Sequence, residues 1–157
     1  MRQTDKYVFF WGGEFSQWYK SDFAVEGVVY TSCEQFMMHK KALFFLDEEI
    51  AEKIMQTNDP KKQKALGRSV RGFKADEWSS VALSYVIEGN FAKFSQNEKL
   101  KQSLIATGSR ILVEASPHDR IWGVGRSEDD VDIETPMLWN GTNLLGFALV
   151  TVRNMLI

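Results

Sequence analysis

Helix-starting signals recur between residues 31 and 108, and they limit the folds open to this chain. Glu34 and Gln35 follow Thr31 and Ser32 with the three-residue spacing of a capping box. Gly67 is a candidate helix stop. Other candidate caps are Asp47, Asp59 before Pro60, and Ser95 or Asn97, with Gly108 as a further stop. These signals and the apolar spacing between them predict helices at residues 33–46, 48–56, 60–67, 75–94 and 98–106.

Strand-like segments flank this helical region. An apolar run at residues 7–11 ends at two glycines, and residues 23–30 form two β-prone runs with a bend at Glu26-Gly27. Residues 110–115 are strand-like, residues 116–142 are irregular, and residues 143–157 form a strongly apolar closing helix. The sequence therefore predicts an α+β fold, with a single predominantly helical domain over residues 1–157 and a small antiparallel β element.

Composition and charge exclude several classes of protein. The 157 residues include 19 basic and 21 acidic side chains, and a net charge of −2 argues against non-specific nucleic-acid binding. No apolar run approaches the roughly 20 residues that a membrane span needs. The single cysteine excludes an internal disulfide and a multi-cysteine metal site. We therefore expect a cytoplasmic protein with no metal and no membrane contact.

Two charged residues lie in the middle of the apolar face predicted for helix 33–46. On a helical wheel, Glu34 and Lys41 fall among methionines and phenylalanines, whereas Gln35 and His39 fall on the solvent side. A charge inside an apolar stripe is costly unless it is paired or functional. The pair is roughly 10 Å apart along the helix, too far for ordinary pairing within it. They form either two separate structural ion pairs or a pocket that holds a carboxylate and an amine. Cys33 is predicted to be an inert core thiol.

A segment with only basic charges follows at residues 61–74. If its helix continues, Lys64, Arg68 and Arg71 share one face. Such a face is either a solvated surface or an anion site, because the planar guanidinium group suits phosphate.

The chemically densest stretch is residues 114–125. There Asp119 lies beside His118, Arg120 and Trp122, which together offer a carboxylate, a base and a stacking surface. The stretch is either a turn in which Asp119 bonds its own backbone or one wall of a site for a planar ligand.

Ordered motifs along nearly the whole chain resemble the NADAR (YbiA-like) family of N-glycosidases. They are Phe9–Gly13, Phe15–Tyr19, Cys33–Ala42, Lys64–Arg68, Phe73 with Trp78, Lys93–Asn97, Ala115–Gly123 and Trp139–Gly146. The common Phe-Ser-Asn motif is Phe15-Ser16-Gln17 here, so the amide is kept although the residue differs.

The resemblance implies a set of pocket residues and no cofactor. Glu34, Lys41 and Asp119 are the implied catalytic residues. The implied substrate-binding residues are Arg68, Trp78, Trp122, Gly123 and Asn143.

The reaction that the resemblance implies is hydrolysis of the N-glycosidic bond between C1 of a phosphorylated or ADP-linked ribose and an amino nitrogen. Two substrate classes follow: phosphoribosylamino-pyrimidine intermediates of riboflavin synthesis, and ADP-ribosylated guanine. Either Lys41 attacks the opened sugar, or a carboxylate activates water. The alternative is a module that binds NAD or ADP-ribose without turnover.

Overall fold

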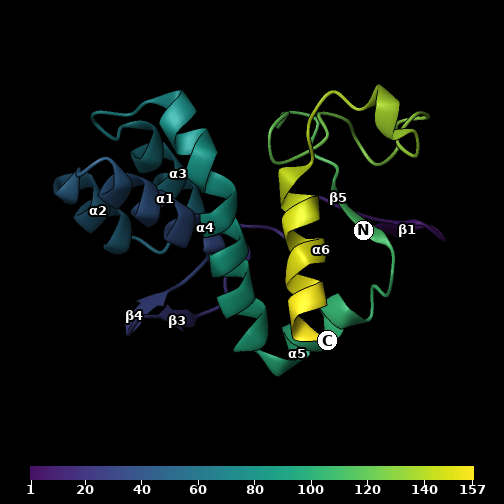
Figure 1. Ribbon diagram of the computed structural model, residues 1–157, viewed down its shortest axis with the longest axis horizontal. Helices are drawn as coiled ribbons and strands as arrows, with labels where there is room; N and C mark the ends of the chain where they lie inside the picture. The colour runs from purple at the N-terminus through teal and green to yellow at the C-terminus, as the bar shows by residue number, and fades with distance from the viewer. The chain divides into compact units, whose positions relative to one another are not determined.

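The computed structural model describes residues 1–157, which divide into two compact units (Figure 1). The helical unit comprises residues 17–96, and the sheet unit comprises residues 1–16 and 97–157. Six α-helices accompany two small sheets, which confirms the α+β prediction. The single-domain boundary stays a prediction. None of the helices combines the length and the apolar character that crossing a membrane requires.

In the helical unit, one helix contacts all the others. This is α1 (Cys33–Phe44), which packs against α2 (Glu48–Met55), α3 (Pro60–Arg68) and α4 (Ala75–Ser95). The predicted caps are in place, since the side chains of Ser32, Asp47 and Asp59 each accept a hydrogen bond from a backbone N–H in the first turn. These side chains satisfy donors that a helix start leaves open, so the starts follow from local sequence.

The predicted solvent side of α1 is wrong at Gln35. This side chain is 1% exposed, and its Nε2 donates to the carbonyl oxygens of Ile54 at 3.1 Å and Thr57 at 3.2 Å. His39 is half-buried, with its Nδ1 2.9 Å from the Tyr30 hydroxyl. A helical wheel orders residues around one axis but carries no information about how many neighbours surround it. Because α2, α3 and α4 all pack on α1, it has no broad solvent face.

Two glycines allow close packing against α1. Gly67, predicted as a helix stop, is buried inside α3, and a Cβ there would overlap the sulfur of Met38. Gly89, in the middle of α4, lies so close to Phe36 that a Cβ would be 2.6 Å from its Cδ1 atom. Both glycines therefore keep room for side chains of α1, although glycine lowers helix propensity.

The predicted hairpin forms between β3 (Phe23–Val25) and β4 (Val28–Tyr30), which pair antiparallel. Glu26 and Gly27 at the bend have φ values of 50° and 80°, as a tight hairpin turn requires. Its inner side chains, Phe23 and Tyr30, join Phe36 of α1 in a buried cluster.

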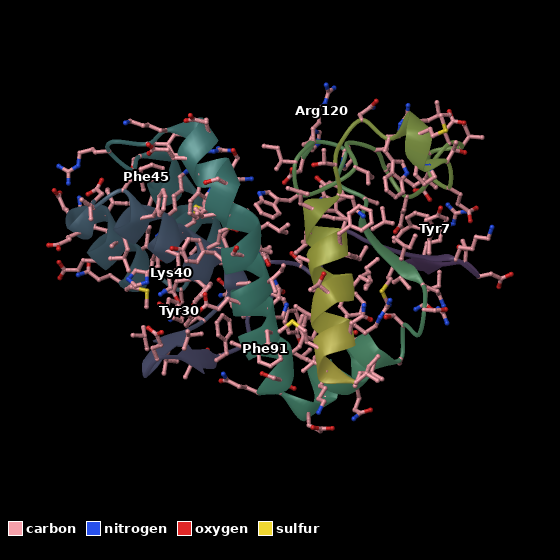
Figure 2. All side chains as sticks on the ribbon, viewed as in Figure 1. Tyr7, Tyr30, Lys40, Phe45, Phe91 and Arg120 are labelled. Carbon is pink, nitrogen blue, oxygen red and sulfur yellow. The ribbon has the colours of Figure 1, made fainter.

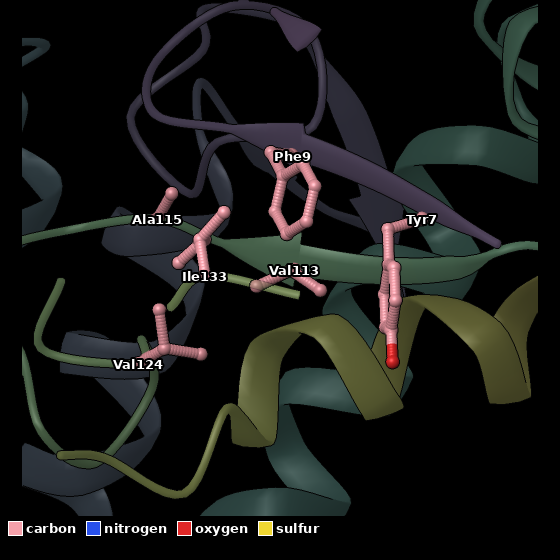
Figure 3. Packing of buried hydrophobic residues seen from close by; sticks show 6 residues of the cluster. All are labelled: Tyr7, Phe9, Val113, Ala115, Val124 and Ile133. Atoms are coloured by element: carbon pink, nitrogen blue, oxygen red, sulfur yellow. The ribbon is translucent and has the colours of Figure 1, made fainter. Parts of the chain in front are cut away.

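The sheet unit is built on three short strands in the order β1-β2-β5. They are β1 (Arg2–Gln3), β2 (Tyr7–Phe10) and β5 (Ile111–Glu114), accompanied by α5 (Glu98–Ile105), α6 (Leu144–Leu156) and the short 3-10 helix η1 (Pro136–Leu138). Figure 3 shows the core on one face of β2 and β5, where side chains of both strands meet Val124 and Ile133 of the irregular segment. Helix α6 packs against β5.

The pairing of β2 with β5 is parallel, in register from Tyr7 opposite Ile111 to Phe10 opposite Glu114. The antiparallel prediction holds for β3–β4 and β1–β2 but not for this pair. Parallel strands require a long connection, and here the whole helical unit lies between them in sequence. The chain segments that follow the two strands therefore leave the sheet at the same edge.

Candidate functional site

The two charged residues singled out in helix α1 are both withdrawn from water. Glu34, in the first turn, is 4% exposed, and Lys41, in the last turn, is half-buried. Burial lowers the pKa of Lys41 below its ordinary value, the negative charge of Glu34 raises it, and the positive charge of Arg68 lowers it further. The helical unit thus brings Glu34, Lys41 and Arg68 into one electrostatic cluster.

Lys41 has an aromatic neighbour rather than an ion-pair partner. Its Nζ lies 4.4 Å from the centre of the Phe73 ring, which comes from the loop between α3 and α4. A cation is attracted by the face of an aromatic ring, but the ring also displaces water from the amine. Lys41 therefore has no salt bridge, and the pocket around it stays a prediction.

An aromatic cluster extends from this point along α4. The rings of Phe45 and Phe73 are 5.4 Å apart, Phe45 and Trp78 are 6.5 Å apart, and Trp78 stacks on Tyr85 at 5.8 Å (Figure 2 labels Phe45). Phe73 is 44% exposed, and Trp78 is half-buried. Partly exposed rings beside a half-buried amine can stack a planar base and exclude water from the chemistry.

In the basic segment at residues 61–74, Arg68 and Arg71 have different surroundings. Helix α3 ends at Arg68, so the continuation that would place Arg71 on the same helical face does not occur. Arg71 instead pairs with Asp47 at 2.7 Å and Glu49 at 3.1 Å. Arg68 is exposed and forms no ion pair, which leaves its guanidinium group available to an anion. Lys64 lies over the Trp18 ring at 5.9 Å.

The other four predicted site residues belong to the sheet unit, where they shape the chain around the ends of its strands. Asp119 Oδ1 accepts hydrogen bonds from the backbone N–H groups of Ile121 at 2.9 Å and Trp122 at 2.8 Å. This is the self-bonded turn anticipated for Asp119. Trp122 is half-buried within this turn. Arg120, next to them, is exposed and points away from the ribbon (Figure 2).

Asn143 and Gly123 tie the same turn to strand β5. The fully buried Asn143 has φ 54°; its Oδ1 accepts from the Glu114 N–H at 3.0 Å and its Nδ2 donates to the Leu112 carbonyl at 3.0 Å. A Cβ on Gly123 would lie 2.9 Å from the Asp119 carbonyl oxygen. Both side-chain polar atoms of Asn143 thus bond the backbone of β5. Contacts of Asn143 and Gly123 with a substrate stay predictions.

No group of three or more His, Cys, Asp or Glu side chains is arranged to hold a metal ion. A groove of about 450 Å³ between α2 and α3 contains none of the predicted site residues. Its lining is Lys53, Gln56, Thr57, Lys62, Ala65 and Leu66.

A known protein family matches nearly the whole length of the chain. A family model described as the NADAR domain matches residues 9–157. The chain belongs to the NADAR domain family. The match runs through both units, from β2 in the sheet unit to the end of α6.

Several relatives of this NADAR chain are named N-glycosidases. N-glycosidase R617 of Acanthamoeba polyphaga mimivirus is 42% identical over an alignment that covers 96% of each chain. The NMR structure of the Escherichia coli protein YbiA matches with a TM-score of 0.80 and 27% identity, over 99% of this chain and 87% of YbiA. The riboflavin biosynthesis protein PYRR of Arabidopsis thaliana is 32% identical over 68% of this chain and 16% of its own length. These similarities support N-glycosidase activity for this NADAR protein.

Two features of the helical unit were not predicted from the sequence: the position of Phe73 beside Lys41 and the burial of Lys93. Phe73 lies on a loop whose place against Lys41 depends on non-local contacts. Lys93 of α4 is fully buried, with its Nζ 5.3 Å from the Tyr19 ring and 4.8 Å from the Phe94 ring. Lys93 and Glu34 both act on the Cys33 thiol, so a buried amine and a buried carboxylate approach the start of α1 together. The signal for Lys93 in the sequence is a lysine inside the apolar run at residues 91–94.

Proposed function

We propose that this NADAR protein hydrolyses the bond between C1 of a phosphorylated or ADP-linked ribose and an exocyclic amino nitrogen. The observation that carries the proposal is the half-buried Lys41 amine, which has a lowered pKa and lies between aromatic rings and the charges of Glu34 and Arg68. The names of its N-glycosidase relatives support the reaction class.

The substrate class supplies a route that suits a neutral amine. A ribose joined through C1 to an amino nitrogen can open to an imine, in which C1 is electrophilic. The neutral Lys41 amine adds to C1, its two protons pass to the departing nitrogen, and the C1–nitrogen bond of the base breaks. The product of this exchange is a Schiff base between C1 and Lys41, together with the free amine.

Water completes the reaction. It adds to C1 of the Schiff base, the C1–Lys41 bond breaks, and the free sugar and the lysine amine are restored. Glu34 is the proposed group that carries protons in both steps, because it is a buried carboxylate in the same cluster. Asp119 is the second carboxylate that could activate water in a direct attack, which is the competing route.

We propose that the substrate is bound by a charge contact to its phosphate and by stacking of its base. Arg68 is the proposed ligand of the phosphate that both substrate classes share. Trp78 is the proposed stacking surface in the helical unit, and Trp122, Gly123 and Asn143 are the proposed contacts in the sheet unit. A riboflavin-related name among the relatives favours the phosphoribosylamino-pyrimidine class, and the ADP-ribosylated guanine class is tested beside it.

The test is release of a base from a panel of ribosylated amines. The panel contains a phosphoribosylamino-pyrimidine, ADP-ribosylated guanosine and, as a control, an ordinary nucleoside whose ribose is bonded to a ring nitrogen. We expect free amine from one or both of the first two and none from the control. A protein that is thermally stabilised by ADP-ribose but releases no base from any compound would instead be a binding module.

A further inference from the structure

A side-chain clamp holds the loop between α3 and α4 against the start of α2. Asp47 Oδ2 accepts hydrogen bonds from the Arg71 backbone N–H at 2.8 Å and from its Nε at 3.1 Å, and Oδ1 accepts from Nη2 at 2.7 Å. The Asp47 side chain is 1% exposed, whereas that of Arg71 is 67% exposed. The buried carboxylate is therefore the fixed partner, and the loop is the part that it holds.

The same loop carries Phe73 to the Lys41 amine. Gly72, directly after Arg71, has φ 76°, a conformation that reverses the chain and brings it near the Phe45 carbonyl oxygen. The Phe73 ring then meets the Phe45 ring at 5.4 Å and the Lys41 nitrogen at 4.4 Å. Because Phe73 is 44% exposed, packing alone holds it weakly, and its place depends on the path of the loop.

We propose that Asp47 and Arg71 are positioning residues that keep Phe73 over the Lys41 amine and so keep water from it. This inference rests on the proposed function, which gives that amine the nucleophilic role. The clamp acts through the ring and not through its own charge. The charges that act on Lys41 are Glu34 of α1 and Arg68 of α3, and neither member of the clamp is among them. At the start of α4, Lys74 and Glu77 pair with each other at 3.8 Å.

The test measures protonation of Lys41 directly in the full chain. The protein is treated with a limiting amount of an acylating reagent over a range of pH, and the Lys41 peptide is quantified by mass spectrometry. Only the neutral amine reacts, so the midpoint of the curve reports its titration. Asp47→Asn is the informative variant, because asparagine still caps α2 but offers one fewer oxygen to Arg71.

We expect Asp47→Asn and Arg71→Ala to move the Lys41 midpoint upward, toward that of exposed lysines in the same digest. The acid limb of the pH profile of kcat should move upward with it, lowering kcat near neutral pH by about 3- to 10-fold. Arg71→Lys, which keeps the charge and the backbone contact, should recover part of the shift. Lys53→Ala breaks the exposed Lys53–Glu49 pair on α2 and should leave the midpoint unchanged.

A double-variant comparison separates positioning from general destabilisation. Phe73→Ala should raise the midpoint with the clamp intact, and adding Arg71→Ala should raise it no further, because both changes remove the same contact. Unchanged midpoints in folded Asp47→Asn and Arg71→Ala would overturn the proposal, as would fully additive shifts. If the midpoint moves as expected but Lys41→Arg retains activity, the clamp stands and the nucleophilic role of Lys41 fails.

Discussion

The Lys41 amine lies 4.4 Å from the centre of the Phe73 ring, although Lys41 is in the last turn of helix α1 and Phe73 is on the loop before α4. An ammonium group gains from the ring face, while the loss of water favours the neutral amine. Burial influences the Lys41 pKa more than the charges of Glu34 and Arg68 do, and the pKa lies below its ordinary value. The lowered pKa favours the neutral form of the amine, which is the form that can act as a nucleophile.

Replacing Glu34 by glutamine should abolish most of the activity and leave the fold intact. The amide keeps the size of the side chain but cannot carry a proton between intermediates, and a general acid or base contributes about 10²- to 10⁴-fold. Steady-state turnover and circular dichroism measure the two parts of the expectation. Glu52→Gln, an exposed carboxylate on α2, is the matched control. Normal turnover by Glu34→Gln would make this carboxylate structural.

Arg68→Ala should weaken substrate binding more than it slows the chemical step. Loss of one charge-assisted contact costs on the order of 1.5–3 kcal/mol, which corresponds to a rise in KM of roughly 10- to 150-fold with kcat little changed. Lys61→Ala removes an exposed positive charge from the same helix and should change neither constant. An unaltered KM for a phosphorylated substrate would remove Arg68 from the site.

Gly89→Ala should destabilise the protein even though alanine is the better helix former. A Cβ at this position would lie 2.6 Å from Cδ1 of the fully buried Phe36 ring, and overpacking of this kind costs about 1–3 kcal/mol. The gain in helix propensity, about 1 kcal/mol, offsets only part of that cost. Urea unfolding should show the loss, Ser84→Ala on the exposed side of α4 should not, and Phe36→Leu should suppress it.

Cys33 should resist thiol reagents at neutral and mildly alkaline pH while the protein is folded. Burial raises the pKa of this thiol to about 11, with a smaller lowering effect of Lys93 and a smaller raising effect of Glu34. The folded state therefore favours the neutral thiol over the thiolate. The stability that this preference contributes is lost as the pH rises through the pKa of the thiol in the folded protein. A chromogenic disulfide should report one thiol only after denaturant is added. Rapid labelling of the native protein at pH 8 would contradict the assignment of an inert core thiol.

The elements that sequence analysis predicted well are those fixed by neighbouring residues. Helix starts at Ser32, Asp47 and Asp59 depend on a side chain two or three positions from the backbone group it bonds, so they can be read directly. The bend at Glu26-Gly27 is equally local. The orientation of Gln35 and the parallel pairing of β2 with β5 depend on segments distant in sequence, and no local pattern carries that information.

The same distinction applies to the candidate site. Glu34 and Lys41 stood out because their charges interrupt an apolar face, which is a conflict visible in the local sequence. The place of Phe73 could not be predicted in this way, because it follows from the contact of Arg71 with Asp47 across the chain. Arg71 was grouped with Arg68 only if the helix continued past Gly67, and α3 ends at Arg68.

Borohydride trapping measures directly whether Lys41 forms a Schiff base with the sugar during turnover. Turnover of a ribosylated amine in the presence of borohydride should reduce the Schiff base and leave one sugar adduct per chain. Peptide mapping should place it on Lys41 and leave the other buried lysine, Lys93, unmodified. Lys41→Arg, which keeps the positive charge without a usable nucleophile, should form no adduct and be as inactive as Lys41→Ala. Substantial activity in Lys41→Arg, with no adduct in the parent protein during turnover, would contradict covalent catalysis and assign the reaction to direct attack by water.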